Sequence, residues 1–457
     1  MLEKEIDSLK EDIIKQTCNL INIPSVSEET GDAEKPFGEG AKKALEYALE
    51  LGKSLGFRTK NIDNYCGYIE FGEGEKLVGI IWHLDVVPSG DGWDTEPFKA
   101  TIKENKIYGR GAIDDKGPVV SALYAMKAVK DNLHVNSRVR LILGINEEKD
   151  WKCINHYKEV EEIPSVGFSP DADFPCIYAE KGICSYFIKE DLSKYKDLAI
   201  KIIEVNCNNN AINVVPKYCR VNIEVDTNKI QLDEVVKNID KTVEYSVNGN
   251  SIELITRGIQ AHAAHPDLGE NAISKMIVCL NNIFKQCNIN IFNFFAKHIN
   301  TEYNGKSLGI DISDETGNLT LNVGKFELIN NNLQIGLNLR IPVNTPINEV
   351  TKKIEKIISN YNLNGEVLGV QQPLFVSKEE KLVKTLTGIF NKAVNGNFEP
   401  IAIGGGTYAR AFKNCVSFGA NFPGDMDMCH QANEFVDIDK LVLASKIYAE
   451  AIYELAK

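Results

Sequence analysis

An apolar run at residues 77–81 leads directly into His83-Leu84-Asp85, and this arrangement of a strand-like segment followed by polar side chains recurs in the early part of the chain. Residues 138–145 precede Glu147-Glu148 in the same way, and Asp171 follows another apolar segment. Ligands of open α/β sheets bind beyond the carboxyl ends of the strands, so these polar side chains are expected to share one crevice. This recurrence restricts the fold more than any other feature of the sequence.

Segments with helical periodicity alternate with the strand-like segments. Helices are predicted over residues 39–55, 118–130 and 151–161, and strands over residues 68–71, 77–87 and 138–145. An amphipathic helix is also predicted over residues 1–20. Strands that alternate with helices imply an α/β sheet that is covered on both faces.

Chain length and a change in sequence character predict two domains. At 457 residues the chain exceeds the size at which a single core keeps growing. Residues 184–373 are rich in Asn and contain alternating segments typical of an antiparallel sheet, and an α/β pattern returns near residues 381–394. We therefore predict an α/β catalytic domain formed by residues 1–183 and 374–457, with an α+β lid domain inserted at residues 184–373.

The composition excludes several classes of partner. The chain is 43% hydrophobic and 25% charged, as soluble globular proteins are, and its net charge of -13 argues against nucleic-acid or anionic-membrane binding. No apolar stretch approaches the roughly 20 residues that a membrane span requires, and residues 1–20 lack the apolar core of a signal peptide. The 11 cysteines include no Cys-x-x-Cys pair, which argues against a disulfide framework and favours the cytoplasm.

The acidic and imidazole side chains predict a centre for two metal ions. Such a hydrolytic site requires carboxylate and imidazole ligands, with one carboxylate that bridges both ions. We predict Asp114 as the bridging ligand, His83 and Asp171 as further ligands of one ion, and Glu148 and His430 as further ligands of the other. Zinc suits two nitrogen ligands with three carboxylates, and manganese or cobalt would also be held.

Each acidic pair is expected to contribute one ligand, because adjacent side chains at a strand end usually diverge. Asp114 is predicted to reach the metals in preference to Asp115, and Glu148 in preference to Glu147. Glu147 would then face the substrate, where its carboxylate can take a proton from the water that bridges the metals. The other member of the first motif, Asp85, would hold the His83 imidazole in place.

Simpler explanations exist for each of these residues taken alone. A Glu-Glu pair is usually surface charge, an Asp-Asp pair usually a turn, and an isolated His usually a solvated or packed residue. Their joint occurrence at successive strand ends favours function, since the acidic pair after residues 138–145 would need a partner if it were buried.

Two further segments are open to more than one interpretation. Gly404-Gly405-Gly406-Thr407 lacks the Gly-Lys-Ser/Thr ending of a P-loop and is either a structural turn or a turn whose N–H groups face a substrate carboxylate. His262, in Ala261-His262-Ala263-Ala264-His265, is by spacing alone a loop histidine.

The stretches that contain these residues resemble a known metallopeptidase family, which includes aminoacylases, carboxypeptidase G-type enzymes, succinyl-diaminopimelate desuccinylase and bacterial dipeptidases. The resemblance is carried by residues 82–88, 109–118, 146–148 and 169–175. Residues 90–94, 404–410 and 430–435 resemble most closely the dipeptidase V branch of that family, the Xaa-His or carnosinase-like dipeptidases. The resemblance implies two zinc ions on the ligands given above, Asp85 as the residue that orients His83, Glu147 as general acid and base, and a cis peptide bond between Asp114 and Asp115.

The resemblance also assigns roles in the inserted lid. It implies that His262 stabilises the tetrahedral oxyanion and that Asn213 and Arg340 contact the substrate. Gly405 is the further substrate-binding residue that we predict, from the interpretation of its turn as one whose N–H groups face a carboxylate. The planar fork of Arg340 suits the terminal carboxylate of a dipeptide, the alternative being a salt bridge on the lid surface. His265 and Cys429 depart from the pattern of close relatives and leave the preferred dipeptide open.

Together these features predict a cytoplasmic dipeptidase that hydrolyses short peptides with a free amino terminus, through a metal-bridging water activated by Glu147. The alternatives are an N-acyl amino acid amidohydrolase with the same chemistry and a noncatalytic metal-dependent binding protein. The expected partner is a small peptide substrate. The resemblance further implies a monomer, whose large lid occupies the space that a dimer partner takes in relatives.

Overall fold

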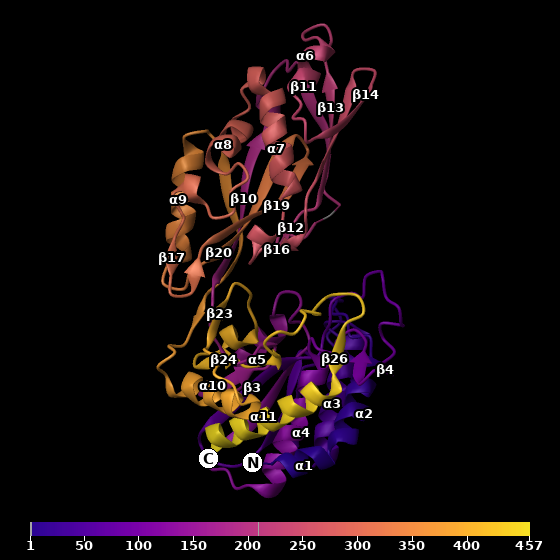
Figure 1. Cartoon of the computed structure of the whole chain (residues 1–457), viewed down its shortest axis with the longest axis vertical. Coiled ribbons are helices and arrows are strands. Elements are labelled where there is room, and N and C mark those ends of the chain that lie inside the picture. The colour runs from indigo at the N-terminus through magenta and orange to yellow at the C-terminus, as the bar shows by residue number, and fades with distance from the viewer. Residues whose placement is uncertain (1, 209) are drawn as a thin grey trace. The chain divides into compact units, whose positions relative to one another are not determined.

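The computed structural model describes residues 2–208 and 210–457, and the chain divides into two compact units. Unit 1 consists of Met1–Ala179, Phe375–Ile401 and Gly406–Lys457, and unit 2 consists of Glu180–Leu374 and Ala402–Gly405. The chain thus leaves unit 1, forms unit 2 and returns, as the colours of Figure 1 show. The sequence indicated an inserted segment at residues 184–373 but gave no indication that residues 402–405 belong with it.

A mixed sheet lies at the centre of unit 1. It contains, in this order, β1 (Arg58–Ile62), β2 (Cys66–Phe71), β6 (Arg138–Gly144), β3 (Leu77–His83), β7 (Val166–Ser169) and β24 (Cys415–Ser417). Every residue of β3 is buried, and β3 runs parallel to both β6 and β7. Three neighbouring strands therefore end at the same edge of the sheet.

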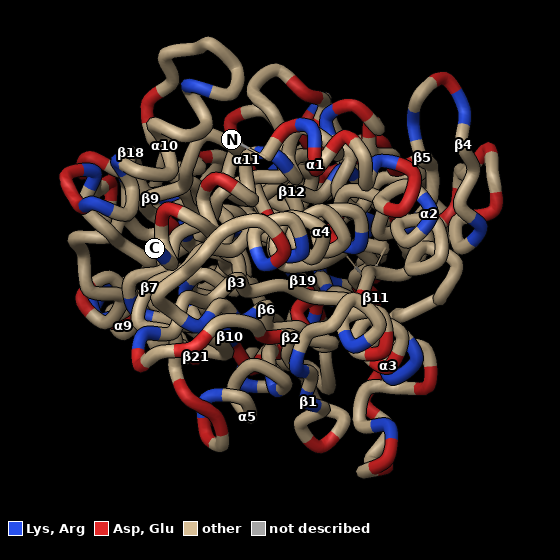
Figure 2. Tube along the Cα trace, turned by 90° about the horizontal axis from the view of Figure 1, so that it is seen from below, with Lys and Arg blue, Asp and Glu red and all other residues tan. Residues whose placement is uncertain are grey.

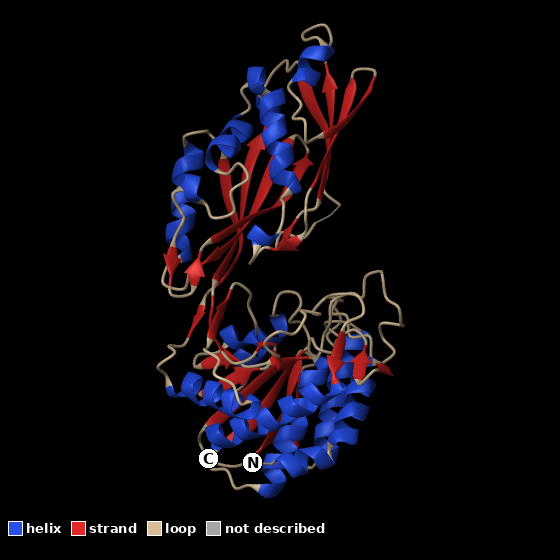
Figure 3. Ribbon diagram, viewed as in Figure 1, coloured by secondary structure: helices blue, strands red, loops and turns tan. Residues whose placement is uncertain are grey.

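Helices lie around this sheet, as Figure 3 shows. They are α2 (Lys10–Ile21), α3 (Glu39–Ser54), α4 (Lys116–Asn132), α5 (Lys152–Val160), α10 (Lys381–Val394) and α11 (Ile438–Ala456). Most of α4 is buried, and it lies beside α11, where Ser121 Oγ donates to the Leu441 carbonyl at 3.0 Å. The predicted α/β fold is confirmed.

Two predicted elements need correction. The single helix expected over residues 1–20 is two helices, α1 (Glu3–Ser8) and α2, because Ser8 Oγ donates to the Glu5 carbonyl at 2.7 Å and competes there with the helical hydrogen bonds. The strand expected over residues 77–87 ends at His83, and beyond it only Val86 forms an isolated bridge, to Val26.

Two four-stranded antiparallel sheets of unit 2 share one hydrophobic core. One sheet has the order β19 (Thr320–Ile329), β20 (Asn332–Ile341), β10 (Gly182–Asp191) and β21 (Asn364–Gln371), and the other has the order β11 (Ile200–Asn206), β13 (Tyr218–Val225), β15 (Ser251–Arg257) and β14 (Glu244–Asn248). Helix α7 (Ala272–Ile283) packs against β13, β15 and β19 and so joins the two sheets. The remaining longer helices are α8 (Asn290–His298) and α9 (Ile347–Ser359).

The charged residues are distributed rather than segregated. Figure 2 shows acidic and basic residues interspersed along the helices and loops that face the viewer. Among the helices of the described residues, none has both the length and the apolar character of a membrane span. All 11 cysteines are free thiols, and the sulfur atoms of Cys207 and Cys219 lie 3.3 Å apart.

Candidate metal centre

Three of the predicted ligands follow the parallel strands of unit 1. His83 is the last residue of β3, and the last residue of β6, Gly144, lies opposite it in register. Glu148 comes shortly after β6, and Asp171 shortly after β7. The order of the strands, β6-β3-β7, therefore places His83 between the segments that carry the two carboxylates.

The other two ligands come from segments that a second, smaller sheet brings together. Strand β5 (Lys106–Tyr108) pairs antiparallel with β26 (Phe435–Asp437), so the segment after β5 lies beside the segment before β26. Asp114 belongs to the first segment, and His430, with φ of 63°, belongs to the second. The peptide bond between Asp114 and Asp115 is cis, as the family resemblance implied.

The five side chains form two groups that share Asp114, and within each group the ligand atoms lie within 4.8 Å of one another. In the first group, His83 Nε2 is 3.2 Å from Asp114 Oδ1 and 3.7 Å from Asp171 Oδ1. In the second, His430 Nε2 is 3.0 Å from Asp114 Oδ2 and 3.1 Å from Glu148 Oε1. Asp114 thus turns one carboxylate oxygen toward each group.

The surroundings of His83 fit a bound cation. Its Nδ1 lies 3.0 Å from the carbonyl oxygen of Asp85, to which it can only donate, so Nε2 of the neutral ring carries a lone pair. That Nε2 atom is buried without a hydrogen-bond partner among the described residues, and it faces the Asp114 and Asp171 carboxylates. Electron-rich atoms that face one another in this way need a cation between them, and imidazole with carboxylates suits zinc, manganese or cobalt.

The same crowding of carboxylates perturbs the pKa values of the centre. Burial disfavours the charged ring of His430, but hydrogen bonds to Asp114 and Glu148 outweigh burial and raise its pKa to about 11. Burial, with the charge of Asp114, raises the pKa of Glu148 to about 7. Without an ion, protons on the imidazoles therefore supply the positive charge that the carboxylates require.

Asp85 differs from the sequence prediction in how it contacts His83. Its carbonyl oxygen, rather than its carboxylate, holds His83 Nδ1, and Asp85 Oδ1 lies 3.6 Å from that nitrogen. The Asp85 carboxylate instead accepts the backbone N–H groups of Glu147 at 3.0 Å and Glu148 at 3.1 Å. The reason is that β3 ends at His83, so Asp85 stands in the following turn and not on the same face of a strand.

Glu147 lies beside the two groups of candidate ligands. Its surroundings favour the protonated form of its carboxyl group. Burial raises the pKa of Glu147 well above its ordinary value; the charge of His83 opposes this shift, and the repulsion of neighbouring carboxylates such as Asp171 adds to it. Because Asp85 holds its backbone, the position of Glu147 depends on the same turn that orients His83.

The sequence-predicted substrate residues belong to unit 2. In the short pairing of β12 (Val214–Val215) with β16 (Ala261–His262), Val214 lies opposite His262, and the Ala263 N–H donates to the Asn213 carbonyl at 2.9 Å. Asn213 and His262 are therefore neighbours, and both are exposed.

Arg340 is buried, contrary to the alternative of a salt bridge on the lid surface. Its side chain is 4% exposed, its Nε donates to Asn338 Oδ1 at 2.9 Å, and its Nη1 donates to the Gly404 carbonyl at 2.7 Å. Arg340 also lies opposite Thr320, whose hydroxyl donates to the Ala263 carbonyl at 3.0 Å. The guanidinium and the Gly405 turn thus belong to the same part of unit 2 as His262.

The glycine at position 404 is required by close packing. A Cβ there would lie 2.7 Å from the Ala264 side chain, two residues from His262. The turn at 404–406 and the histidine loop therefore approach each other more closely than any residue with a side chain would allow.

Sequence reasoning missed two residues of the centre, Arg110 and Glu434. Both stood in the motifs that carried the resemblance, yet neither was given a role. They form an ion pair with an N–O distance of 2.7 Å and side chains 1% and 0% exposed. A signal was present, because both motifs contain charged residues that the ligand assignment leaves unused, and Arg110 and Glu434 are among them.

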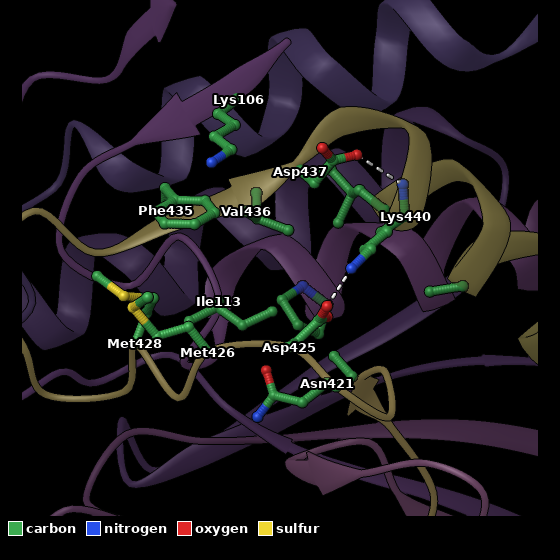
Figure 4. A pocket seen from close by; sticks show the side chains of 15 residues that line it. Lys106, Ile113, Asn421, Asp425, Met426, Met428, Phe435, Val436, Asp437 and Lys440 are labelled. Carbon is green, nitrogen blue, oxygen red and sulfur yellow. Dashed lines mark hydrogen bonds and ion pairs between the residues drawn. The ribbon is translucent and has the colours of Figure 1, made fainter. Parts of the chain in front are cut away.

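A cavity of about 320 Å³ adjoins the backbone of the centre in unit 1. Ile113, which precedes Asp114, and Met428, two residues before His430, contribute to its wall. Figure 4 shows Met426 and Met428 close to Ile113. It also shows the ion pair between Lys440 and Asp425 in the wall of the same cavity. Among the described residues, the five candidate ligands do not line this cavity, so it is separate from the metal groups.

The sequence pattern of peptidase family M20/M25/M40 matches residues 79–454 of the chain. The chain belongs to this family. It is 39% identical over 469 residues to the Bacillus subtilis (strain 168) protein named "Putative dipeptidase YtjP", a match that spans 100% of this chain and 99% of the relative. These findings make the chain a metallopeptidase.

Solved structures show the same fold. Human carnosine dipeptidase 1 is 14% identical with a TM-score of 0.61, and the match covers 100% of this chain and 98% of the human one. The Saccharomyces cerevisiae di-peptidase Dug1p is 16% identical with a TM-score of 0.60, and the match covers 99% and 98% of the two chains. At this identity the likeness concerns the fold alone.

Proposed function

We propose that the chain is a dipeptidase of the dipeptidase V, carnosinase-like branch, which holds two zinc ions and hydrolyses short peptides with a free amino terminus. One observation carries the proposal: two groups of ligand atoms share the carboxylate of Asp114, and Glu147 stands beside them. The full-length match to a relative that is named as a dipeptidase supports the substrate class.

In this proposal His83, Asp114 and Asp171 hold one ion, and Asp114, Glu148 and His430 hold the other. When bound, two such ions polarise the scissile carbonyl and lower the pKa of a water between them. The carbonyl oxygen of Asp85 keeps His83 in the tautomer that presents Nε2, which is the form a ligand must have.

Glu147 serves as general base and then as general acid. Its carboxylate takes a proton from the attacking water as the new C–O bond forms, and it gives that proton to the nitrogen as the C–N bond breaks.

Unit 2 supplies the groups that recognise the substrate. The His262 imidazole stabilises the oxyanion, the Arg340 guanidinium binds the terminal carboxylate, and Asn213 with the backbone of Gly405 completes the contacts. The support is the neighbourhood of these residues within unit 2, where Arg340 is already oriented by Asn338.

We further propose that the enzyme acts as a monomer in the cytoplasm, with small peptides as its partners and without nucleic acid or membrane. The interspersed charges and the net charge of -13 support the exclusion of polyanions.

A substrate panel tests the proposal. Purified protein loaded with zinc is assayed on dipeptides with a free amino terminus and on the same sequences with an acetylated amino terminus. The proposal expects hydrolysis of the free dipeptides with a preference of at least roughly tenfold in kcat/KM. A preference for the acylated substrates would replace the dipeptidase by an N-acyl amino acid amidohydrolase, and zinc binding without any hydrolysis would replace it by a binding protein.

A further inference from the structure

We infer that Arg110 and Glu434 are positioning residues that together fix the bridging carboxylate of Asp114 and the ring of His430. The inference concerns the metal centre of the proposed function and rests on it. Neither residue belongs to the ligand groups, and the side chains of both are almost completely buried.

The Glu434 carboxylate organises the backbone that leads into Asp114. Its Oε2 accepts the Gly111 N–H at 3.1 Å, and its Oε1 accepts the N–H groups of Ile113 at 3.0 Å and Asp114 at 3.2 Å. Three amides of one short segment are therefore aimed at a single carboxylate. The orientation of the Asp114 side chain, which must turn one oxygen to each ion, follows from that segment.

The Arg110 guanidinium connects the same segment to the loop of His430. Its Nη1 donates to Glu434 Oε2 at 2.7 Å and to the Gln431 carbonyl at 3.3 Å, and its Nη2 approaches the His430 carbonyl at 3.4 Å. Nη2 also donates to the Ser89 carbonyl at 3.1 Å, in the segment that follows Asp85. One planar fork thus ties together three segments that each carry residues of the centre.

Fold stability alone does not account for this pair. A buried ion pair is often no more stabilising than apolar residues of the same volume, because both charges lose their hydration. The geometric role predicts something else, namely that weakening the pair lowers metal affinity. Residues that orient metal ligands through hydrogen bonds typically contribute about 10- to 100-fold to metal affinity.

The chain offers a matched control in unit 1. Arg140 and Glu70 form another ion pair with an N–O distance of 2.7 Å and side chains 5% and 8% exposed. This pair joins the neighbouring strands β2 and β6, and it also involves the hydroxyl of Tyr157 at 2.8 Å from Arg140. The Arg140–Glu70 pair is therefore similar to the Arg110–Glu434 pair in burial and charge. It does not share the contacts of Arg110 and Glu434 with the segments that contain Asp114 and His430.

The test measures zinc affinity with zinc alone as the probe. Metal-free full-length wild type, Glu434→Gln, Arg110→Lys and Glu70→Gln are titrated with zinc against a competing chelating dye, and the unfolding temperature of each metal-free form is recorded. Glu434→Gln places an amide NH₂ among N–H donors, and Arg110→Lys loses the fork, so both should weaken zinc binding by about 10- to 100-fold. Glu70→Gln should lower the unfolding temperature while zinc affinity stays within about twofold of wild type.

Two results would overturn the inference: wild-type zinc affinity in both Glu434→Gln and Arg110→Lys, or an equal loss of affinity in Glu70→Gln. Should Glu434→Gln fail to fold, Glu434→Asp keeps the charge and shortens its reach, and it should bind zinc more weakly than wild type. A wild-type protein that binds no zinc would instead reject the proposed function, so the two failures are distinguishable.

Discussion

The carboxylate of Asp85 accepts the backbone N–H of Glu147 at 3.0 Å, which ties the turn after β3 to the proposed catalytic residue after β6. The same residue holds His83 through its carbonyl oxygen at 3.0 Å. One residue therefore positions both the candidate metal ligand His83 and the proposed general base Glu147, the first through its carbonyl oxygen and the second through its carboxylate.

Replacing Asp85 with asparagine should impair catalysis more than its distance from the substrate suggests. Asparagine offers a single acceptor oxygen, so the N–H of either Glu147 or Glu148 would face an NH₂ group. We expect kcat to fall by about 10- to 100-fold and the free energy of unfolding to fall by about 1–3 kcal/mol. Steady-state kinetics and denaturant unfolding check this, with Asp63→Asn, at an exposed carboxylate that pairs with His156, as the control. A kcat equal to wild type would show that the two hydrogen bonds do not matter for catalysis.

Glu147→Gln should separate proton transfer from metal binding. The amide keeps the shape of the side chain but cannot take a proton from water, so kcat should fall by roughly 100- to 10,000-fold. Zinc content should stay at the wild-type value, because Glu147 is not among the ligand groups. Glu148→Gln is the matched neighbour, and it should lose zinc as well as activity. Retained turnover of Glu147→Gln with zinc bound would remove Glu147 from the mechanism.

Arg340→Met should affect peptides with a free terminal carboxylate selectively. Hydrogen bonds to a charged group contribute about 1.5–3 kcal/mol, which corresponds to roughly 10- to 100-fold in kcat/KM. The same variant is assayed on a dipeptide and on its C-terminal amide, so any loss of folded protein cancels between the two substrates. The loss should appear for the acid and be small for the amide. An equal loss for both would mean that the contacts of Arg340 to Asn338 and Gly404 serve only the structure.

The metal-free protein should lose stability as the pH rises. Burial lowers the pKa of His430, but its hydrogen bonds to Asp114 and Glu148 prevail and raise it from 6.5 to about 11. A group whose pKa is raised by folding stabilises the folded state fully below its unfolded pKa, and this contribution is lost as the pH rises toward the folded value. Calorimetry of metal-free protein should therefore show an unfolding temperature that falls as the pH rises from about 6.5 toward 11. The fall should be shallower in His430→Gln. If the unfolding temperature fell equally steeply with pH in both proteins, the pH dependence would not come from His430.

The sequence predicted which side chains gather at the candidate metal centre because their signals are local. His83, Glu148 and Asp171 each follow an apolar strand, and parallel strands that end at one edge bring such residues together. The helices α3, α4 and α5 were predicted within a few residues for the same reason, since their apolar periodicity is a local property.

What the sequence did not predict depends on contacts between distant segments. Arg110 and Glu434 are 324 positions apart, and only the pairing of β5 with β26 makes them neighbours. The role of the Asp85 backbone depends on where β3 ends, and strand ends are the least certain part of a periodicity pattern. The membership of residues 402–405 in unit 2 likewise follows from packing against Ala264 and from the hydrogen bond of Arg340.

The most direct test of the central claim is anomalous X-ray scattering at the zinc edge from crystals of the zinc-loaded protein. The proposal predicts two peaks, one bounded by His83, Asp114 and Asp171 and the other by Asp114, Glu148 and His430, with one Asp114 oxygen turned to each. A single peak, or two peaks with Asp114 bound to neither, in crystals of enzyme that hydrolyses dipeptides would contradict it.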